Sequence, residues 1–227
     1  MNSTNLQHPA LVFDMDGVIL DTESLVRRCW HLLAPEYGLD AGDLDQVFLS
    51  TVGTTRMYTG EILRTHYGAD FPSEQFNSHV SRTFHAIADT DGIPVKPGVR
   101  ALLDWAKNAG FRIGLASSTR EVTIRRELEH AQLYHCFDHV IGGDRIARSK
   151  PYPDIYEAAC RALAVLPADA FAIEDSYNGI RAAAAAGMRP VMVPDLLPPT
   201  DEMRTLCHSI FPDLAAFRSF LAQQFSA

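Results

Sequence analysis

The chain has 227 residues, 47% of them hydrophobic, which is enough to bury the core of one good-sized domain or of a domain with a smaller insertion. Its 20 basic and 28 acidic residues give a net charge of -8 without a Lys/Arg cluster, which argues against nucleic acid or a membrane as a partner. No segment offers the roughly 18 to 20 apolar residues of a membrane span, and the first residues lack the features of a secretion signal. We expect a cytoplasmic protein with a small soluble ligand; the oligomeric state is open, with a monomer favoured.

The first strand is expected at residues 10–13, "ALVF", and the segment after it has a different character. From 22 to 93 the sequence offers amphipathic helical stretches and no convincing strand. These helical stretches are 23–38, 56–68 and 73–90. We interpret 22–93 as a helical insertion that departs after the first strand and returns near residues 94–97.

From about residue 96 short apolar runs alternate with longer amphipathic stretches, a pattern typical of a parallel sheet covered on both faces. The expected strands are 112–117, 139–143, 170–175 and 190–193. The expected helices are 99–110, 120–133, 153–165, 177–188 and 215–227. The sequence therefore predicts an α/β fold, in which a Rossmann-like parallel sheet flanked by helices comprises residues 1–21 and 94–227, and an all-helical domain is inserted at 22–93.

Polar side chains follow several of the expected strands, where ligands of open parallel sheets bind. The residues at these strand ends or in the adjacent loops are Asp14, Asp16, Ser117, Ser118, Lys150, Glu174 and Asp175. Crowded carboxylates without His or Cys suit a hard cation such as Mg²⁺. A hydroxyl and an ammonium can hold phosphoryl oxygens, an aspartate can attack phosphorus, and a second acid can move the proton. The set predicts phosphoryl chemistry.

Four segments with their flanks carry a resemblance to a known family. They are "FDMDGVILDTE", "LASST", "SKPYPDIY" and "IEDSYNGIRAAAAAGM", in this order and over nearly the whole chain. The sequence resembles the haloacid dehalogenase-like superfamily, specifically the branch with a helical cap after the first motif. That branch includes small sugar-phosphate phosphatases and β-phosphoglucomutase, so the resemblance implies that 22–93 is a cap domain.

The resemblance also implies catalytic roles. Asp14 matches the nucleophile that forms an aspartyl-phosphate, and Asp16 matches the acid/base. Ser117 matches the phosphate-binding hydroxyl and Lys150 the ammonium of the third motif. A different role for Ser117, as the N-cap of the following helix, competes with this one, but Ser118 or Thr119 can cap that helix equally well.

For the metal, the resemblance implies Mg²⁺ held by Asp14, by the backbone carbonyl of Asp16 and by Asp175. Glu174 is either a further ligand or an anchor behind the ligands. The dehalogenases of the superfamily lack the second acid of the first motif, so Asp16 argues against that activity.

Contacts to the substrate are less well marked. Arg56 falls where related sugar-phosphate enzymes place an arginine, but it also suits an ordinary helix start. Glu23, Ser118 and Arg120 are further candidates for contact with a small phosphorylated substrate, and for Arg120 a surface position on the next helix is equally plausible.

The residue at position 26 bears on whether the reaction is that of a phosphatase or of a mutase. Where the resembling phosphoglucomutases carry a histidine, this chain has Val26, which favours transfer of the phosphoryl group to water over transfer to a sugar hydroxyl. Four histidines elsewhere in the insertion offer substitutes: His31, His66, His79 and His85. We expect a Mg²⁺-dependent phosphatase of a small metabolite, such as a sugar phosphate. The alternatives are a sugar phosphomutase and a non-catalytic protein that binds a phosphorylated metabolite.

Overall fold

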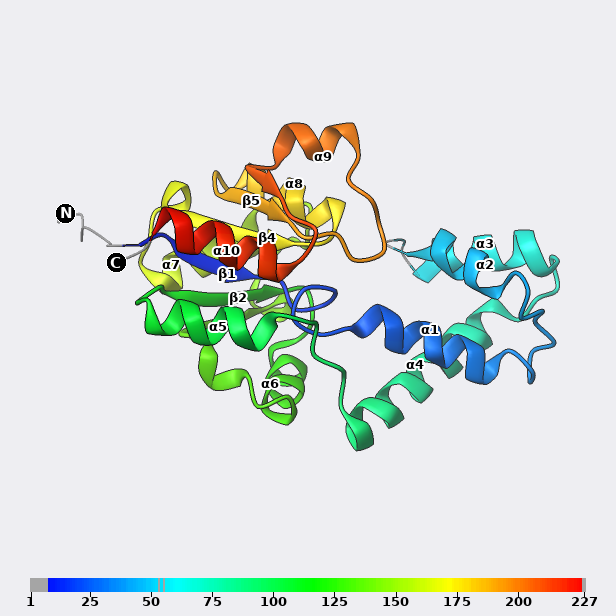
Figure 1. Ribbon diagram of the computed structural model, residues 1–227. Coiled ribbons are helices and arrows are strands. Elements are labelled where there is room, and N and C mark those ends of the chain that lie inside the picture. Colours follow the sequence, from blue (N-terminus) through cyan, green and yellow to red (C-terminus); the bar gives the residue numbers. More distant parts are fainter. Residues whose placement is uncertain (1–7, 53, 55, 226–227) are drawn as a thin grey trace. The chain divides into compact units, whose positions relative to one another are not determined.

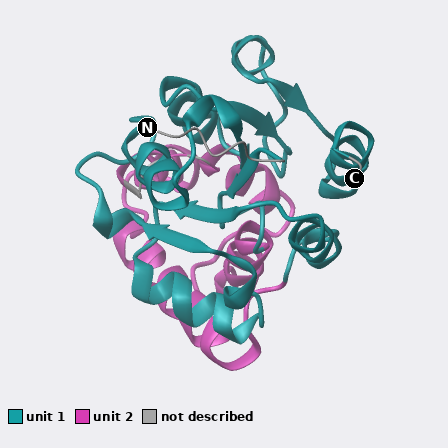
Figure 2. Cartoon of the chain, turned by 90° about the vertical axis from the view of Figure 1, so that its left-hand side faces the viewer, with its two compact units in different colours: residues 1–20, 95–227 teal, residues 21–94 magenta. Residues whose placement is uncertain are grey.

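The computed structural model describes residues 8–52, 54 and 56–225, apart from the side chain of Arg56. The chain splits into two compact units, which Figure 2 shows in different colours. Unit 1 comprises Met1–Leu20 and Val95–Ala227, and unit 2 comprises Asp21–Pro94. No helix among the described residues is both long and apolar enough to cross a membrane.

Unit 1 is built on one six-stranded sheet in which every neighbouring pair of strands is parallel. The strands are β1 (Ala10–Phe13), β2 (Ile113–Ser117), β3 (His139–Gly142), β4 (Ala170–Glu174), β5 (Arg189–Met192) and β6 (Ser209–Ile210). Their order in the sheet is β3-β2-β1-β4-β5-β6. Every residue of β1, β2 and β4 is buried, as expected for central strands covered on both faces. The predicted α/β fold is confirmed.

Helices cover both faces of this sheet (Figure 1). They are α5 (Val99–Asn108), α6 (Glu121–His130), α7 (Asp154–Leu163), α8 (Tyr177–Ala185), α9 (Asp201–Leu206) and α10 (Leu214–Gln224). On one face α7 packs on β2 and β3, and its neighbour α8 packs on β4 and β5. The contacts of α5 with β2 and α10 place these two helices on the other face (Figure 1).

The core has a different character on each face of the sheet. Ala10 and Val12 pack with the small side chains of α7 and α8, among them Ala159 and Ala183. Phe171 instead lies in an aromatic group with the rings of α10 and its C-terminal end, since Phe217, Phe220 and Phe225 all contact it. Small residues let α7 and α8 approach the sheet, whereas large rings fill the wider space under α10.

Several short elements of the structure were not expected from the sequence. Helix α9 and strand β6 lie between the last predicted strand and the closing helix, and α2 (Leu44–Thr51) lies in the insertion. Each has at most eight residues, so its periodic pattern is short. The edge strand β6 has only two residues, neither of them buried.

Unit 2 is helical: its described residues contain no strand. Besides α2 it contains α1 (Thr22–Leu33), α3 (Arg56–Tyr67) and α4 (Ser73–Asp91). Trp30 of α1 packs edge-on against Phe48 of α2 and Phe76 of α4, with ring centroids 5.4 and 5.0 Å away. This aromatic contact joins three of the four helices and gives the unit a core of its own.

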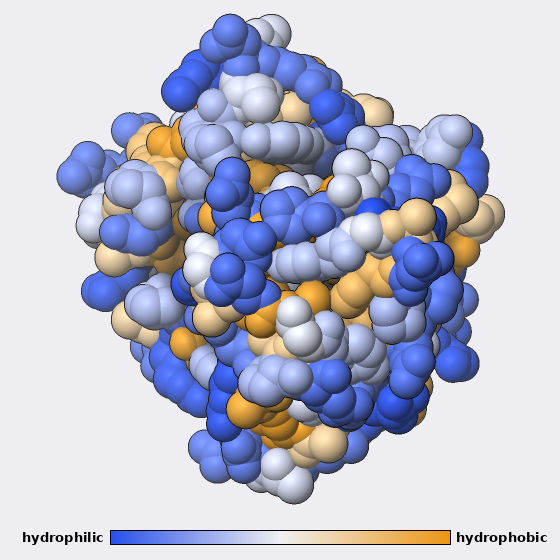
Figure 3. Space-filling view, turned by 90° about the vertical axis from the view of Figure 1, so that its right-hand side faces the viewer, coloured by the Kyte–Doolittle hydropathy of each residue, from blue (hydrophilic) through white to orange (hydrophobic). Residues whose placement is uncertain are grey.

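The surface view in Figure 3 is mostly hydrophilic, with hydrophobic residues in small groups between polar ones. The exposed large hydrophobic side chains in the helices of unit 2 are Leu32, Leu49, Met57 and Tyr58. Scattered exposed apolar residues are normal for a folded chain and need no partner to explain them.

The central strand β1 should be the most sensitive part of the core. Leu11 is fully buried, so Leu11→Ala should lower the free energy of unfolding by about 3 kcal/mol, because it leaves a cavity between strand and helices. Leu166→Ala is the matched control: this leucine is 69% exposed, and its loss should cost less than about 0.5 kcal/mol. Urea unfolding measures both, and equal losses would contradict this description of the core.

Candidate active site

The end of β1 places the first acidic residue. Asp14 follows directly after Phe13, and its backbone N–H donates to the carbonyl of Ile173 on β4 at 2.9 Å. The chain then turns at Gly17, whose backbone N–H donates to the carbonyl of Leu20 at 2.9 Å. Asp14 is therefore held between two buried strands, and its side chain is almost completely shielded from solvent.

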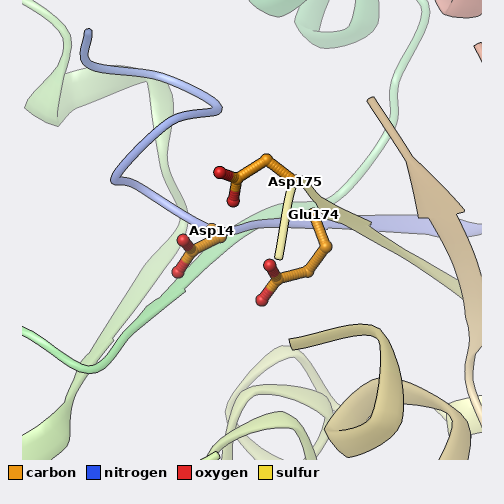
Figure 4. A group of neighbouring side chains, drawn as sticks. All are labelled: Asp14, Glu174 and Asp175. Atoms are coloured by element: carbon orange, nitrogen blue, oxygen red, sulfur yellow. The ribbon is translucent and has the colours of Figure 1, made fainter. Parts of the chain in front are cut away.

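A second pair of carboxylates lies beside it, at the end of β4. Phe13 and Ile173 are partners in the register of β1 and β4, so Glu174 and Asp175 follow at the same edge of the sheet as Asp14. Figure 4 shows the three side chains gathered at these strand ends. One oxygen from each carboxylate lies within 4.8 Å of the others. Such spacing can hold a single cation.

Lys150 lies between two of these carboxylates. Its Nζ donates to Asp14 Oδ1 and to Glu174 Oε1, both at 2.6 Å, and to the carbonyl of Ala116 at 3.2 Å. The three protons of the ammonium thus have three acceptors. The side chain is only 8% exposed, so this pairing is what makes its burial possible.

Glu174 is enclosed by donors. Oε1 also accepts from the hydroxyl of Tyr156 at 2.5 Å, and Oε2 accepts from Ser176 Oγ at 3.0 Å. A Cβ on Gly179 would lie 1.9 Å from the Glu174 carboxyl carbon, so only glycine fits there. Both oxygens accept from protein donors, which suits an anchor for Lys150, while the place of Glu174 in the acidic group also suits a metal ligand.

Sequence reasoning missed Tyr156 and Ser176. Tyr156 is fully buried in α7, where its position in the apolar stripe of a helix indicates only packing. A tyrosine among aliphatic residues is the one signal that a buried polar partner was needed. Ser176 caps α8 by accepting from Gly179 N at 3.1 Å while it donates to Glu174, a double role that spacing does not reveal.

Asp16 is turned towards the end of β2. Its Oδ2 accepts from Thr119 Oγ1 at 3.1 Å and lies 3.4 Å from Ser117 Oγ, which itself accepts from Thr119 N at 3.1 Å. The structure therefore brings Asp14, Asp16, Ser117 and Lys150 to one edge of the sheet, together with Glu174 and Asp175.

The expectation that Ser118 or Thr119 caps the next helix is wrong. The N-cap of α6 is Arg120, which makes no side-chain cap hydrogen bond. The first N–H of the helix, that of Glu121, instead donates to Asp144 Oδ1 at 2.9 Å. The physical reason is that an acceptor from another loop satisfies the helix end, so the hydroxyl of Thr119 is used by Asp16.

The candidate substrate contacts are distributed over both units. Ser118 and Arg120 are exposed residues of unit 1, next to Ser117. Glu23 lies in the first turn of α1 in unit 2. Arg56 begins α3 in the same unit, and its side chain lies outside the described part of the chain. All four stay predictions.

Burial and mutual repulsion raise the pKa values of two acidic groups of the site, Asp14 and Asp175. Burial, opposed by Lys150 and reinforced by Glu174 and Asp16, raises the pKa of Asp14 to about 7. Burial, with Glu174 and Asp14 adding to it, also raises the pKa of Asp175 well above its usual value. For Lys150, burial works against the charge, but Asp14 and Glu174 outweigh it and raise its pKa. The total negative charge of the carboxylates exceeds the single positive charge of Lys150. A bound cation would therefore stabilise the site.

The arrangement lies at the carboxyl ends of the strands, where open parallel α/β sheets bind their ligands. The family model "haloacid dehalogenase-like hydrolase" matches residues 8–187. This chain belongs to that family, and the resemblance found in the sequence is confirmed.

Three proteins illustrate the relationship. The chain is 34% identical over 195 residues to the protein CbbY of Cereibacter sphaeroides, covering 82% of this chain and 84% of the other. It is 30% identical over 194 residues to hexitol phosphatase B of Escherichia coli (strain K12), with 85% and 86% covered. The crystal structure of CbbY from Rhodobacter sphaeroides in complex with phosphate superposes with a TM-score of 0.67 at 29% identity, covering 92% and 95%.

The raised pKa of Asp14 predicts a pH dependence of stability. A carboxyl whose pKa rises from 3.8 when unfolded to about 7 when folded binds more protons in the folded state, so its contribution to the free energy of unfolding falls as pH rises between these values. Without divalent cations, wild-type stability should fall from about pH 4 to about pH 7, and Asp14→Asn should remove part of this slope. Urea unfolding in EDTA measures it; parallel curves would contradict the assignment.

Gly17 makes room for Asp175. Its φ is +76°, and a Cβ would lie 2.3 Å from Asp175 Oδ2. Gly17→Ala should therefore combine a backbone penalty of about 1 to 2 kcal/mol with displacement of that carboxylate. Gly187→Ala is a matched control, because Gly187 has the same φ and its Cβ would meet nothing closer than 4.0 Å. The Gly17 variant should lose at least about 1 kcal/mol more than the control in urea unfolding; equal losses would exclude the clash.

Proposed function

We propose that this chain is a Mg²⁺-dependent phosphatase of a small phosphorylated metabolite and that it works through an aspartyl-phosphate on Asp14. The observation that carries the proposal is the position of Lys150, whose ammonium joins Asp14 to Glu174 beside the hydroxyls that contact Asp16. The proposed nucleophile Asp14, the proton carrier Asp16 and the phosphate-binding donors then lie at one edge of the sheet. Membership of the hydrolase family supports the same reaction class.

The residues present suit Mg²⁺. Oxygen-only donors fit a hard cation, and the three carboxylates of Asp14, Glu174 and Asp175 exceed the single positive charge of Lys150, so a cation would neutralise the remainder. Asp14 and Asp175 would hold the ion with their carboxylates and Asp16 with its backbone carbonyl, while Glu174 anchors Lys150. When bound, the ion neutralises charge on the phosphoryl oxygens and orients them for attack.

In the first step, a carboxylate oxygen of Asp14 attacks phosphorus, and the bond between phosphorus and the leaving oxygen breaks. The ammonium of Lys150 and the hydroxyl of Ser117 stabilise the charge on the equatorial oxygens. Asp16 gives its proton to the leaving oxygen as the alcohol departs. In the second step, Asp16 takes a proton from water, which attacks the aspartyl-phosphate and releases inorganic phosphate and free Asp14.

The proposed substrate class is inferred from the relatives. CbbY crystallises with phosphate, and a hexitol phosphatase is among the related enzymes, so a phosphorylated sugar or polyol is the proposed substrate class. Unit 2 would act as the cap whose closure excludes bulk water, and the proposed substrate contacts are Arg56 and Glu23 of the cap and Ser118 and Arg120 of the core.

Two observations favour a phosphatase over a mutase. Position 26 is a valine, and valine cannot pass a proton to a sugar hydroxyl. The histidines that offer a substitute are engaged within unit 2, because His31 contacts Asp45 at 2.7 Å, His66 contacts Asp43 at 2.6 Å and His79 contacts Glu36 at 3.5 Å. His85 packs against the ring of Phe84.

The reaction is tested by phosphate release from a panel of phosphorylated sugars and polyols, with Mg²⁺ and with EDTA. Wild type should release phosphate only with Mg²⁺, and Asp14→Asn should lower kcat on the order of 10⁴-fold or more, because the nucleophile is lost. Asp201→Asn, an exposed residue at the start of α9, is the control and should keep full activity.

Three outcomes would contradict the proposal. Full activity of Asp14→Asn would exclude the aspartyl-phosphate. An isomerised sugar phosphate without net phosphate release, and with a requirement for a bisphosphate, would show a mutase. Binding of phosphorylated sugars without Mg²⁺-dependent turnover of any of them would show a non-catalytic binding protein.

A further inference from the structure

A further carboxylate, that of Asp195, lies near the site. The backbone N–H of Val193 donates to the carbonyl of Glu174 at 2.8 Å, so the loop after β5 starts beside the end of β4. Asp195 follows two residues later. The sequence segment "PDLLPP" gives no indication of a role for this aspartate, since such a composition is typical of a loop.

Asp195 has one oxygen paired and one not. Its Oδ1 accepts from Lys96 Nζ at 2.6 Å, and its side chain is 9% exposed. Its Oδ2 is buried and has no hydrogen-bond partner in the described structure. A buried carboxylate oxygen without a donor is costly, and native structures normally supply that donor from protein, water or a ligand.

A pocket lies next to the start of this loop. It has a volume of about 190 Å³, and its lining includes Gly17, Lys96 and the two residues before Asp195, Val193 and Pro194. Gly17 is the residue whose missing side chain makes room for the Asp175 carboxylate. A pocket of this size, next to charged groups, has room for several water molecules.

The negative charge of Asp195 interacts with the proposed metal site. Together with burial, Glu174 and Asp14, it contributes to raising the pKa of Asp175. An extra negative charge behind a metal ligand destabilises the metal-free site and strengthens attraction for a cation. Lys96 offsets part of that charge through its ion pair with Oδ1.

We propose that Asp195 is a positioning residue for the metal: its negative charge, in the loop that starts beside the end of β4, increases the affinity of the site for Mg²⁺, and its Oδ2 accepts a hydrogen bond from water in the adjoining pocket. Lys96 sets the strength of this effect by partly neutralising Asp195. The inference rests on the metal site of the proposed function and adds a residue pair to it. The opposing view is that Asp195 serves only as the structural partner of Lys96.

The two views predict different metal affinities, measured by isothermal titration of the protein with Mg²⁺ without substrate. Asp195→Asn keeps the shape but removes the charge, and it should weaken the Kd for Mg²⁺ about 10-fold. Lys96→Met removes the neutralising cation, so it should tighten the Kd severalfold. Glu202→Gln is the control: it breaks the ion pair between Glu202 and Arg181 with the same change in net charge, and should leave the Kd unchanged.

Activity separates this inference from the proposed function. At saturating Mg²⁺, Asp195→Asn should approach the wild-type kcat, while the Mg²⁺ concentration for half-maximal rate rises as the Kd does. Unchanged Kd values in both variants, with Mg²⁺ still bound by wild type, would overturn the inference and leave the phosphatase intact. Absence of Mg²⁺ binding by wild type would overturn both. If Asp195→Asn does not fold, the direction of the change in Lys96→Met decides alone.

Discussion

The structure of the site depends on one buried ammonium. Lys150 contacts the carboxylate directly after β1, a carboxylate on β4 and a carbonyl on β2, so it joins the ends of three adjacent strands. Burying these charges is favourable only because every proton of the ammonium has an acceptor. One ammonium neutralises one of the two carboxylates, and Asp175 adds a further acid beside them. The protein itself therefore leaves a deficit of positive charge at this edge.

Two glycines leave room for the carboxylates at this edge of the sheet, because they have no side chain. Glu174 ends a fully buried strand and Asp175 follows it, and their side chains lie where a Cβ on Gly179 or on Gly17 would be. Two motifs far apart in the sequence are thereby coupled, because the first motif has to omit a side chain for the fourth motif to place its carboxylate. Gly17 thus serves the site twice: its positive φ turns the chain after Asp16, and its missing side chain admits Asp175.

The sheet and its helices were predictable because their patterns are local. The strand 10–13 and the helices at 99–110 and 177–188 each carry their own periodicity, and the structure has an element of the expected type at each place. The carboxylates of the site were found for the same reason, since each follows an apolar run. Contacts such as that between Tyr156 and Glu174 were not, because a hydroxyl in the apolar stripe of a helix has the same spacing whether or not it has a partner.

The ion pair between Lys96 and Asp195 could not be predicted from the sequence either. Lys96 lies 99 residues before Asp195, and no repeat, motif or spacing links the two in the sequence. The fold joins them because β5 pairs beside β4, which brings the loop after β5 to the strand end that carries Asp175. Where several acidic residues gather at one edge of a sheet, the affinity for a cation depends on every buried charge at that edge, including charges that do not touch the ion. A pair such as Lys96 and Asp195 can therefore adjust the site without altering the four motifs.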